Sequence, residues 1–338
     1  MTDSTELPPL SNELIDPFGR KVDYLRLSVT DRCNLRCTYC MAEDMTFLPR
    51  QQILSLEELR DVASAFVELG VRKIRLTGGE PLIRRDIIKL VSAISDLPSL
   101  DEVTMTTNGM LLPKMAQPLK DAGLNRLNIS IDSLRPDRFK ALTRLGDLDV
   151  WHKGIRAAKA ANFAKLKLNA VILAGFNDEE VLDLARYAID NQMDISFIEE
   201  MPLGEISSHQ RVNTQITSQA LRDQLETEFD LTDSVETTGG PSRYVKVAGS
   251  DSKIGFISPM SNNFCDSCNR VRMTAEGRLL LCLGNEQSMD LRAVIRSHPG
   301  DSGLLRAKIL EALQSKPERH EFDPNRTDIV RFMNMTGG

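Results

Sequence analysis

The sequence predicts an α/β fold in which a parallel sheet is connected by helical crossovers. Six runs rich in β-branched or apolar residues follow one another, and helical patterns lie between them. Periodicity alone leaves open an open doubly wound sheet and a complete or partial barrel, and both forms bind ligands at the carboxyl ends of the strands. The expected strands cover residues 24–30, 73–77, 102–107, 126–131, 166–173 and 195–201.

The clearest expected helix begins at Ser55, which forms a capping box with Glu58, and it stops before Gly70. Apolar residues repeat at helical spacing between these signals. A second helical pattern covers residues 85–94, and a third begins near Asn177. Each of these helices falls between two expected strands, as a crossover requires.

After about Phe229 the regular alternation of strand and helix patterns ends. Short mixed segments at 244–247 and 254–257 then follow a Gly-Gly-Pro turn. We therefore expect an N-terminal extension (1–15), a larger domain (16–234) and a smaller C-terminal α+β domain (235–338). Residues 316–338 are polar, contain two prolines and end in two glycines, so an extended tail is expected.

The composition is that of a globular protein, with 41 % hydrophobic and 27 % charged residues in a chain of 338. The net charge of -6 does not favour bulk nucleic-acid binding. Neither a membrane span nor a secretory signal is evident, so a cytoplasmic location is expected. Six cysteines in such a chain favour metal ligation over disulfides.

Three of these cysteines, Cys33, Cys37 and Cys40, lie within eight residues directly after the first expected strand. Three thiolates on one loop are suited to an iron-sulfur cluster with one open iron, whereas structural zinc normally needs four protein ligands. A Gly-Gly-Glu-Pro segment follows the second strand. Its glycines allow close approach of backbone to a ligand, and Glu80 is a candidate acceptor for an ammonium group.

The other three cysteines are Cys265, Cys268 and Cys282. This spacing is compatible with zinc, redox or iron-sulfur roles. The nearest histidines, His298 and His320, are not obvious fourth ligands. Three ligands again favour a cluster with an open iron.

The first loop, with Tyr39 before its third cysteine, resembles the signature of the radical S-adenosylmethionine superfamily. The Thr106–Gly109 segment, the run from Cys265 to Arg272, Cys282 and the terminal Gly-Gly narrow the resemblance to the GTP 3′,8-cyclase family of molybdenum cofactor biosynthesis, over residues 16–338. The resemblance implies a partial (β/α)6 TIM-type barrel with a smaller C-terminal domain that carries a second cluster. It also implies two [4Fe-4S] clusters and S-adenosylmethionine as cofactors.

The implied reaction converts GTP to (8S)-3′,8-cyclo-7,8-dihydroguanosine 5′-triphosphate, through a 5′-deoxyadenosyl radical that abstracts hydrogen from ribose C3′. The resemblance assigns S-adenosylmethionine contacts to Tyr39, Gly79, Ser130 and Met201. It assigns GTP contacts to Arg26, Arg75, Thr106, Lys167, Arg270, Val271 and Arg272. It assigns catalytic roles to Cys33, Cys37, Cys40, Arg270, Arg272, Gly337 and Gly338.

Family likeness alone also implies a homodimer, a flavodoxin-type electron donor and transfer of the product to a cyclic pyranopterin monophosphate synthase. Neither nucleic acid nor membrane is expected as a partner. Two alternatives remain. A radical maturase acting on a peptide usually needs more C-terminal cysteines than three, and a zinc-bound scaffold would contain zinc in place of iron.

Overall fold

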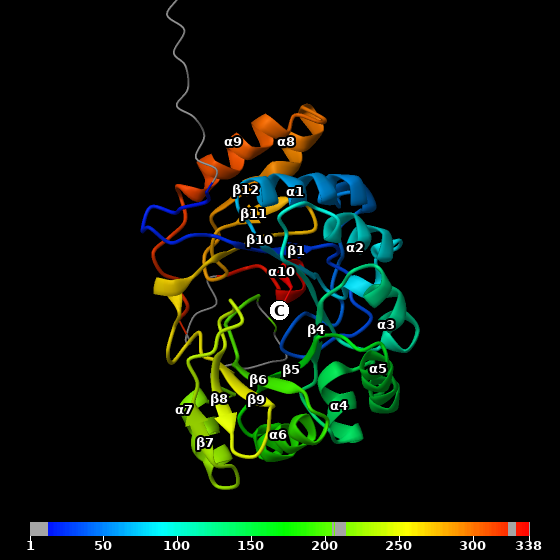
Figure 1. Cartoon of the computed structure of the whole chain (residues 1–338), viewed down its shortest axis with the longest axis vertical. Coiled ribbons are helices and arrows are strands. Elements are labelled where there is room, and N and C mark those ends of the chain that lie inside the picture. The colour runs from blue at the N-terminus through cyan, green and yellow to red at the C-terminus, as the bar shows by residue number, and fades with distance from the viewer. Residues whose placement is uncertain (1–12, 205, 207–213, 324–328, 338) are drawn as a thin grey trace, which may run out of the picture.

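A computed structural model describes residues 13–204, 206, 214–323 and 329–337 of the chain. Six parallel strands form the partial barrel expected for the family, and Figure 1 shows them around a central space. The predicted strands are confirmed, with ends that differ by at most two residues. Their bounds are β1 (Tyr24–Ser28), β2 (Lys73–Thr77), β3 (Glu102–Thr107), β4 (Arg126–Ser130), β5 (Lys165–Ile172) and β6 (Asp194–Glu199).

Helices cover the outer face of this barrel (Figure 1). They are α1 (Leu56–Glu68), α2 (Ile87–Ser95), α3 (Leu112–Asp121), α4 (Pro136–Thr143), α5 (Leu148–Ala160) and α6 (Val181–Asp190). The predicted capping box is confirmed at α1. Ser55 Oγ accepts a hydrogen bond from the Glu58 amide at 3.1 Å, and the Glu58 carboxylate accepts one from the Ser55 amide at 2.7 Å.

The C-terminal part of the chain extends the same sheet at both edges. On the β6 side, β9 (Lys253–Ile257) and β8 (Arg243–Val247) lead to β7 (Leu231–Asp233). On the β1 side, β10 (Arg270–Met273) pairs in parallel with β1 and leads to β11 (Arg278–Leu280) and β12 (Ser288–Asp290). The sheet is therefore continuous across residue 234, and the division into domains there stays a prediction. Helices α7 (Ser218–Glu226), α8 (Leu291–Ser297) and α9 (Ser302–Leu313) complete this part.

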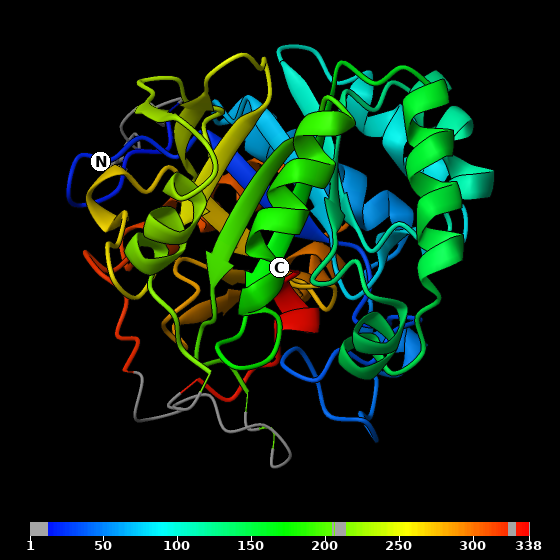
Figure 2. The same cartoon turned by 90° about the horizontal axis from the view of Figure 1, so that it is seen from below.

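In its described part, the expected tail (316–338) is not extended throughout. Its last described stretch (329–337), here called the C-terminal segment, contains the short helix α10 (Met333–Thr336), and Figures 1 and 2 show α10 inside the ring of strands. Asn334 and Thr336 are each 1 % exposed. Polar composition misled the prediction because Asn334 is buried with a partner: its Nδ2 donates to the carbonyl of Asp31 at 2.7 Å.

Strand alternation places aliphatic and charged residues on opposite faces of the barrel. On β1, Leu25 and Leu27 belong to the core beneath the helices, whereas Tyr24 and Arg26 face the interior. Arg26 is in register with Arg75 on β2 and with Arg272 on β10. The barrel interior is consequently lined by cations on neighbouring strands. Within the described part of the chain, the helices are too short or too polar to cross a membrane.

The capping box gives a direct test of the fold. Ser55→Ala removes the Oγ that accepts the Glu58 amide, so we expect the free energy of unfolding to fall by about 1 kcal/mol. Urea denaturation followed by circular dichroism measures this loss. Ser64→Ala is the matched control in the interior of α1, where alanine is the better helix former, and it should not destabilise the protein. Equal losses from both substitutions would contradict the capping role.

Candidate functional site

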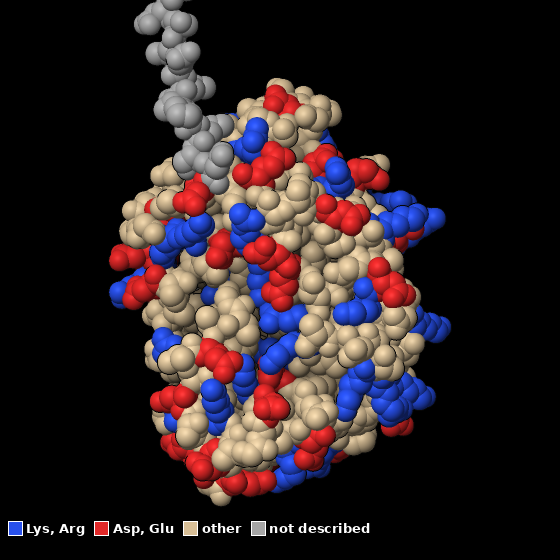
Figure 3. Space-filling model, viewed as in Figure 1, with Lys and Arg blue, Asp and Glu red and all other residues tan. Residues whose placement is uncertain are grey.

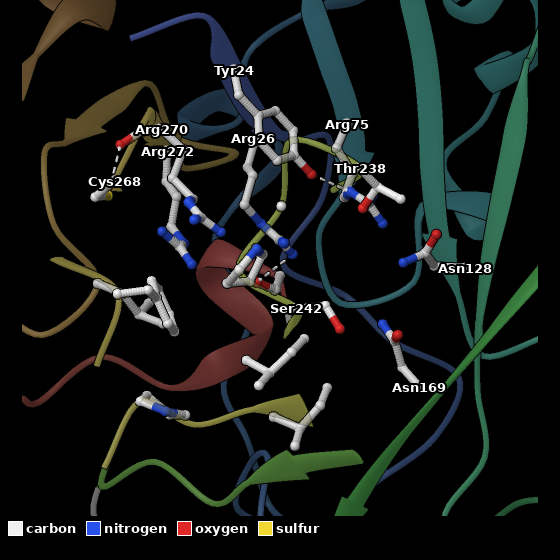
Figure 4. A pocket seen from close by; sticks show the side chains of 18 of the residues that line it. Tyr24, Arg26, Arg75, Asn128, Asn169, Thr238, Ser242, Cys268, Arg270 and Arg272 are labelled. Carbon is white, nitrogen blue, oxygen red and sulfur yellow. Dashed lines mark hydrogen bonds between the residues drawn. The ribbon is translucent and has the colours of Figure 1, made fainter. Parts of the chain in front are cut away.

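Two adjoining cavities occupy the interior of the barrel, with about 1260 and 1050 Å³ of open space. The larger, here called the arginine cavity, is shown in Figure 4. The smaller, here called the loop cavity, lies beside the 33–40 loop. Residues lining both cavities are Asn169, Ile198, Met201 and Met333.

The loop cavity is lined by the thiols of Cys33, Cys37 and Cys40. Burial raises the pKa of Cys33 to about 11 and that of Cys37 well above its ordinary value. These thiols are therefore neutral in the protein alone, and a bound metal is what would make them thiolates. The predicted cofactor contacts Tyr39, Gly79, Ser130 and Met201 line the same cavity.

Asp132 is a loop-cavity residue that sequence reasoning missed. It follows β4 and accepts a hydrogen bond from the Tyr39 hydroxyl at 2.7 Å. Its other carboxylate oxygen accepts the Val171 amide at 2.8 Å. Burial raises the pKa of Asp132 to about 6. Asp132 thus fixes the aromatic ring beside Cys40 to the end of β5.

The Gly-Gly-Glu-Pro segment supports the cysteine loop by close backbone contact. A Cβ on Gly79 would lie 2.2 Å from the carbonyl oxygen of Arg32, so only glycine fits there. Glu80 is completely buried, and its carboxylate accepts hydrogen bonds from the Leu82 amide, the Thr107 hydroxyl and the Asn108 amide. These bonds join the ends of β2 and β3, so Glu80 stabilises the framework, and its role as an acceptor for an ammonium group stays a prediction.

The arginine cavity collects cations from β1, β2, β4, β5 and β10, and Figure 3 shows Lys and Arg side chains near the centre of this face. Five are predicted substrate contacts: Arg26, Arg75, Lys167, Arg270 and Arg272. Two more, Arg126 and Lys165, were not predicted. The predicted contact Thr106 lines the loop cavity, but its Oγ1 accepts a hydrogen bond from Arg75 at 3.2 Å. Thr106 and Arg75 therefore connect the two cavities.

Arg270 and Arg272 point into the arginine cavity from β10 (Figure 4). The Nε atoms of both are buried without a hydrogen-bond partner in the described part of the protein. Val271, between them, packs its side chain into the hydrophobic core and does not line the cavity. Burying a charged donor without a partner is costly, and an anionic ligand in this cavity can supply the missing acceptors.

The second cysteine triad lines the same cavity: Cys265, Cys268 and Cys282. Burial alone would raise the pKa of Cys268, but Lys316, Arg270 and Arg272 together lower it to about 7. Lys316 was not predicted. His320 also lines this cavity, whereas His298 is exposed and its Nδ1 lies 2.9 Å from Ser297 Oγ.

Neither triad forms a single-ion site. Among the described residues, no three His, Cys, Asp or Glu side chains are grouped closely enough to hold one metal ion. Zinc would need all its thiolate ligands about 2.3 Å from one centre. A cluster of several irons binds each thiolate at a different iron, so it does not need the three thiols to meet at one centre.

The C-terminal segment contacts the predicted substrate residues. Arg26 Nη2 donates to the carbonyl of Gly337 at 3.2 Å. Gly337 has a φ of +71°, and a Cβ there would lie 1.8 Å from Thr77 Oγ1. Both conditions require glycine. The other predicted terminal residue, Gly338, lies outside the described residues.

Tyr24 is a further residue of the arginine cavity that sequence reasoning missed. Its ring lies 5.3 Å from Lys73 Nζ, and its hydroxyl accepts a short hydrogen bond from Arg75 Nε. Burial alone would raise the pKa of Tyr24, but Arg75, Arg26, Lys73 and Arg270 together lower it to about 7. The phenol therefore offers partial negative charge to a cluster of cations.

Comparison with known proteins gives consistent results over most of the chain. Residues 27–188 match the radical SAM superfamily, and residues 193–322 match Molybdenum Cofactor Synthesis C. The GTP 3′,8-cyclase of Pseudomonas entomophila (strain L48) is 60 % identical over 96 % of this chain and 98 % of its own length. The GTP 3′,8-cyclase of Pseudomonas putida (strain W619) is 59 % identical over 97 % and 99 %.

A solved structure, that of Streptococcus suis SuiB bound to S-adenosylmethionine, is similar with a TM-score of 0.58. It covers 94 % of this chain and 77 % of the SuiB chain at 15 % identity. At this identity the likeness supports the fold alone, and it agrees with the radical SAM barrel.

The cations around Tyr24 predict an unusual titration. In metal-free protein, the ultraviolet absorbance of tyrosinate should show one phenol ionising near pH 7, and Arg75→Met should raise that pKa. Because the folded-state pKa lies below the ordinary value of 10.0, the associated stability is full above pH 10.0 and declines as the pH falls towards 7. Arg60→Met removes an exposed cation on α1 and should leave the titration unchanged. A Tyr24 pKa that is the same with and without Arg75 would refute this electrostatic cause.

The contact between Gly337 and Thr77 predicts that alanine cannot replace this glycine. In Gly337→Ala, the new Cβ would clash with Thr77, so the C-terminal segment should leave its place and exchange its amide hydrogens faster. Hydrogen-deuterium exchange of residues 329–337 measures this. Gly300→Ala is the control, because Gly300 has a φ of +81° but nothing within 4 Å of its Cβ position. It should cost about 1–2 kcal/mol without changing exchange in the segment. Unchanged exchange in Gly337→Ala would show that the segment is held otherwise.

Proposed function

This chain belongs to the GTP 3′,8-cyclase family of the radical SAM superfamily, and we propose that it converts GTP to (8S)-3′,8-cyclo-7,8-dihydroguanosine 5′-triphosphate. This is the first step of molybdenum cofactor biosynthesis. One observation carries the proposal. A cavity between two cysteine triads contains seven cationic side chains, and two of them, Arg270 and Arg272, have buried Nε atoms without a partner among the described residues.

The residues fit the cofactors that this reaction needs. Cys33, Cys37 and Cys40 would hold the [4Fe-4S] cluster that binds S-adenosylmethionine, and Cys265, Cys268 and Cys282 would hold a second [4Fe-4S] cluster. When bound, the first cluster and S-adenosylmethionine supply a 5′-deoxyadenosyl radical that takes hydrogen from ribose C3′. The close packing of Gly79 on the cysteine loop and the anchoring of Tyr39 by Asp132 would keep this cofactor site rigid.

The cations would bind the triphosphate. Arginine matches phosphate oxygens with two parallel donors, and lysine acts as a point charge. Arg26, Arg75 and Arg272 lie in register on adjacent strands, so their side chains enter the cavity at the same level. Lys167 reaches it from β5, where its Nζ donates to the Tyr244 hydroxyl at 2.8 Å. Hydrogen bonds hold Arg26, Arg75 and Lys167 in place before substrate arrives, which lowers the entropic cost of binding.

The ribose would lie where the two cavities join. Hydrogen transfer needs the 5′ carbon of the deoxyadenosyl group and C3′ of the ribose to lie close together. The loop cavity would hold the deoxyadenosyl group, and the arginine cavity would hold the triphosphate. Asn169, Met201 and Met333 line both cavities and would surround this junction. The C-terminal segment, held by Arg26 at Gly337, would close one side of it and exclude water.

Family membership extends the proposal to the setting of the reaction. We include a homodimer, a flavodoxin-type electron donor, a cytoplasmic location and transfer of the product to a cyclic pyranopterin monophosphate synthase.

The two cysteine triads provide the test of function. Anaerobically reconstituted protein with dithionite, S-adenosylmethionine and GTP should yield 5′-deoxyadenosine together with a cyclised nucleotide, measured by liquid chromatography and mass spectrometry. Alanine at Cys33, Cys37 or Cys40 should abolish cofactor cleavage. Alanine at Cys265, Cys268 or Cys282 should mainly weaken GTP binding and turnover, because these residues line the arginine cavity.

Ser267→Ala is the control, since Ser267 lies between two cysteines of the second triad and is exposed. It should retain full activity. Formation of 5′-deoxyadenosine with GTP unchanged would sink the substrate assignment but keep the superfamily. Equal loss of cofactor cleavage from both triads, with the fold intact, would contradict the division of roles.

A further inference from the structure

We infer that Lys316 is a positioning residue for the second cluster, where its ammonium holds the cysteine-bearing segments together and stabilises the reduced cluster. The inference rests on the proposed function, because it assumes a cluster on Cys265, Cys268 and Cys282. Lys316 follows α9 and is distant in sequence from all three cysteines. Its role concerns the cluster's ligands and not the substrate.

The Lys316 ammonium is buried and has an acceptor for each of its three N–H groups. Lys316 is 3 % exposed. Its Nζ donates to the Leu281 carbonyl at 2.6 Å, to the Arg270 carbonyl at 3.2 Å and to Cys268 Sγ at 3.7 Å. An ammonium has three donors and no acceptor, so this site matches it fully. A buried lysine without such partners would be strongly disfavoured.

These acceptors belong to two separate segments of the second triad. Leu281 immediately precedes Cys282, and Arg270 lies two residues after Cys268. Lys316 therefore fixes the distance between the segments that carry two of the three ligands. It also holds the first residue of β10, whose side chain enters the arginine cavity (Figure 4).

The third ligand is tied to the same stretch of chain by Arg20. Arg20 Nη1 donates to the Cys265 carbonyl at 2.8 Å and to the Glu318 carbonyl at 2.6 Å, and Nη2 donates to the Pro317 carbonyl at 2.7 Å. Asp16 pairs with Arg20 Nε at 2.5 Å, which neutralises this guanidinium. Residues 316–318 are thus connected to all three cysteine-bearing segments, directly through Lys316 or indirectly through Arg20.

The charge of Lys316 has a consequence for electron transfer. Its three hydrogen-bond acceptors are two carbonyls and a thiol, so no carboxylate among them cancels its charge. Hydrogen bonds to the sulfurs and nearby charge are main determinants of iron-sulfur reduction potentials. A fixed positive charge next to a thiolate ligand favours the reduced cluster, which carries one more electron. Lys316 should therefore raise the reduction potential of the second cluster.

The test isolates the second cluster in full-length protein that carries Cys33→Ala, Cys37→Ala and Cys40→Ala. Potentiometric titration followed by electron paramagnetic resonance gives its midpoint potential. Lys316→Met should lower the ratio of reduced to oxidised cluster about tenfold at a fixed potential, the effect of one charge-assisted hydrogen bond, or about 59 mV for one electron. Iron should also leave this variant faster in the presence of a chelator.

Three variants make the result specific. Lys316→Gln keeps donors for the carbonyls but has no charge, so it should show the same shift, and it decides the question if Lys316→Met does not fold. Lys316→Arg keeps the charge and should restore the midpoint towards that of the parent. Lys308→Met removes a half-exposed lysine of α9 that pairs with Glu311, and should change nothing.

An unchanged midpoint in a folded, iron-loaded Lys316→Gln or Lys316→Met variant would overturn the inference. A Lys316→Met variant with a native circular dichroism spectrum that loses iron from the second site would support the role of Lys316 in holding the cysteine-bearing segments together. Failure of the parent triple variant to hold any cluster would instead count against the proposed function.

Discussion

The burial of positive charge inside the barrel is the constraint on which the rest of the structure depends. Arg26, Arg75 and Arg272 occupy equivalent positions on three adjacent parallel strands, so their positively charged guanidinium groups lie near one another. Like charges in a poorly solvated space repel, and each also loses hydration. The aliphatic face of the same strands packs under the helices, and the free energy of this apolar burial offsets the cost of burying the charges.

The protein neutralises this charge only in part. Carboxylates pair with Arg126 and Lys165, whereas the Tyr24 phenol is the acceptor for Arg75, the Tyr244 phenol for Lys167 and the Gly337 carbonyl for Arg26. A carboxylate at each position would give a more stable empty cavity and would compete with an anionic ligand. The choice of weak acceptors therefore keeps a net positive field for a polyanion and lets each cation exchange its partner at little cost.

Much of this was predictable from the sequence, because the strands are marked by their apolar residues and the charged residues interrupt them at alternate positions. The same alternation placed Tyr24 on the face of Arg26, a signal that was present and not used. Asp132 and Lys316 carried no local signal, since their partners come from distant segments. The C-terminal segment was misjudged because hydrogen bonds that bury polar residues such as Asn334 depend on tertiary structure.

The pairing of β10 with β1 explains why neither half of the chain holds a complete site. This contact brings Arg270 and Arg272, which lie between Cys268 and Cys282 of the second triad, alongside Arg26, which precedes the first triad. The C-terminal segment then passes inside the barrel and reaches Arg26 and Thr77. Strands β1 and β2 and the C-terminal segment thus meet at the cavity. The position of one triad relative to the other is fixed by main-chain hydrogen bonds of a continuous sheet, which is a stiffer connection than a hinge between separate domains.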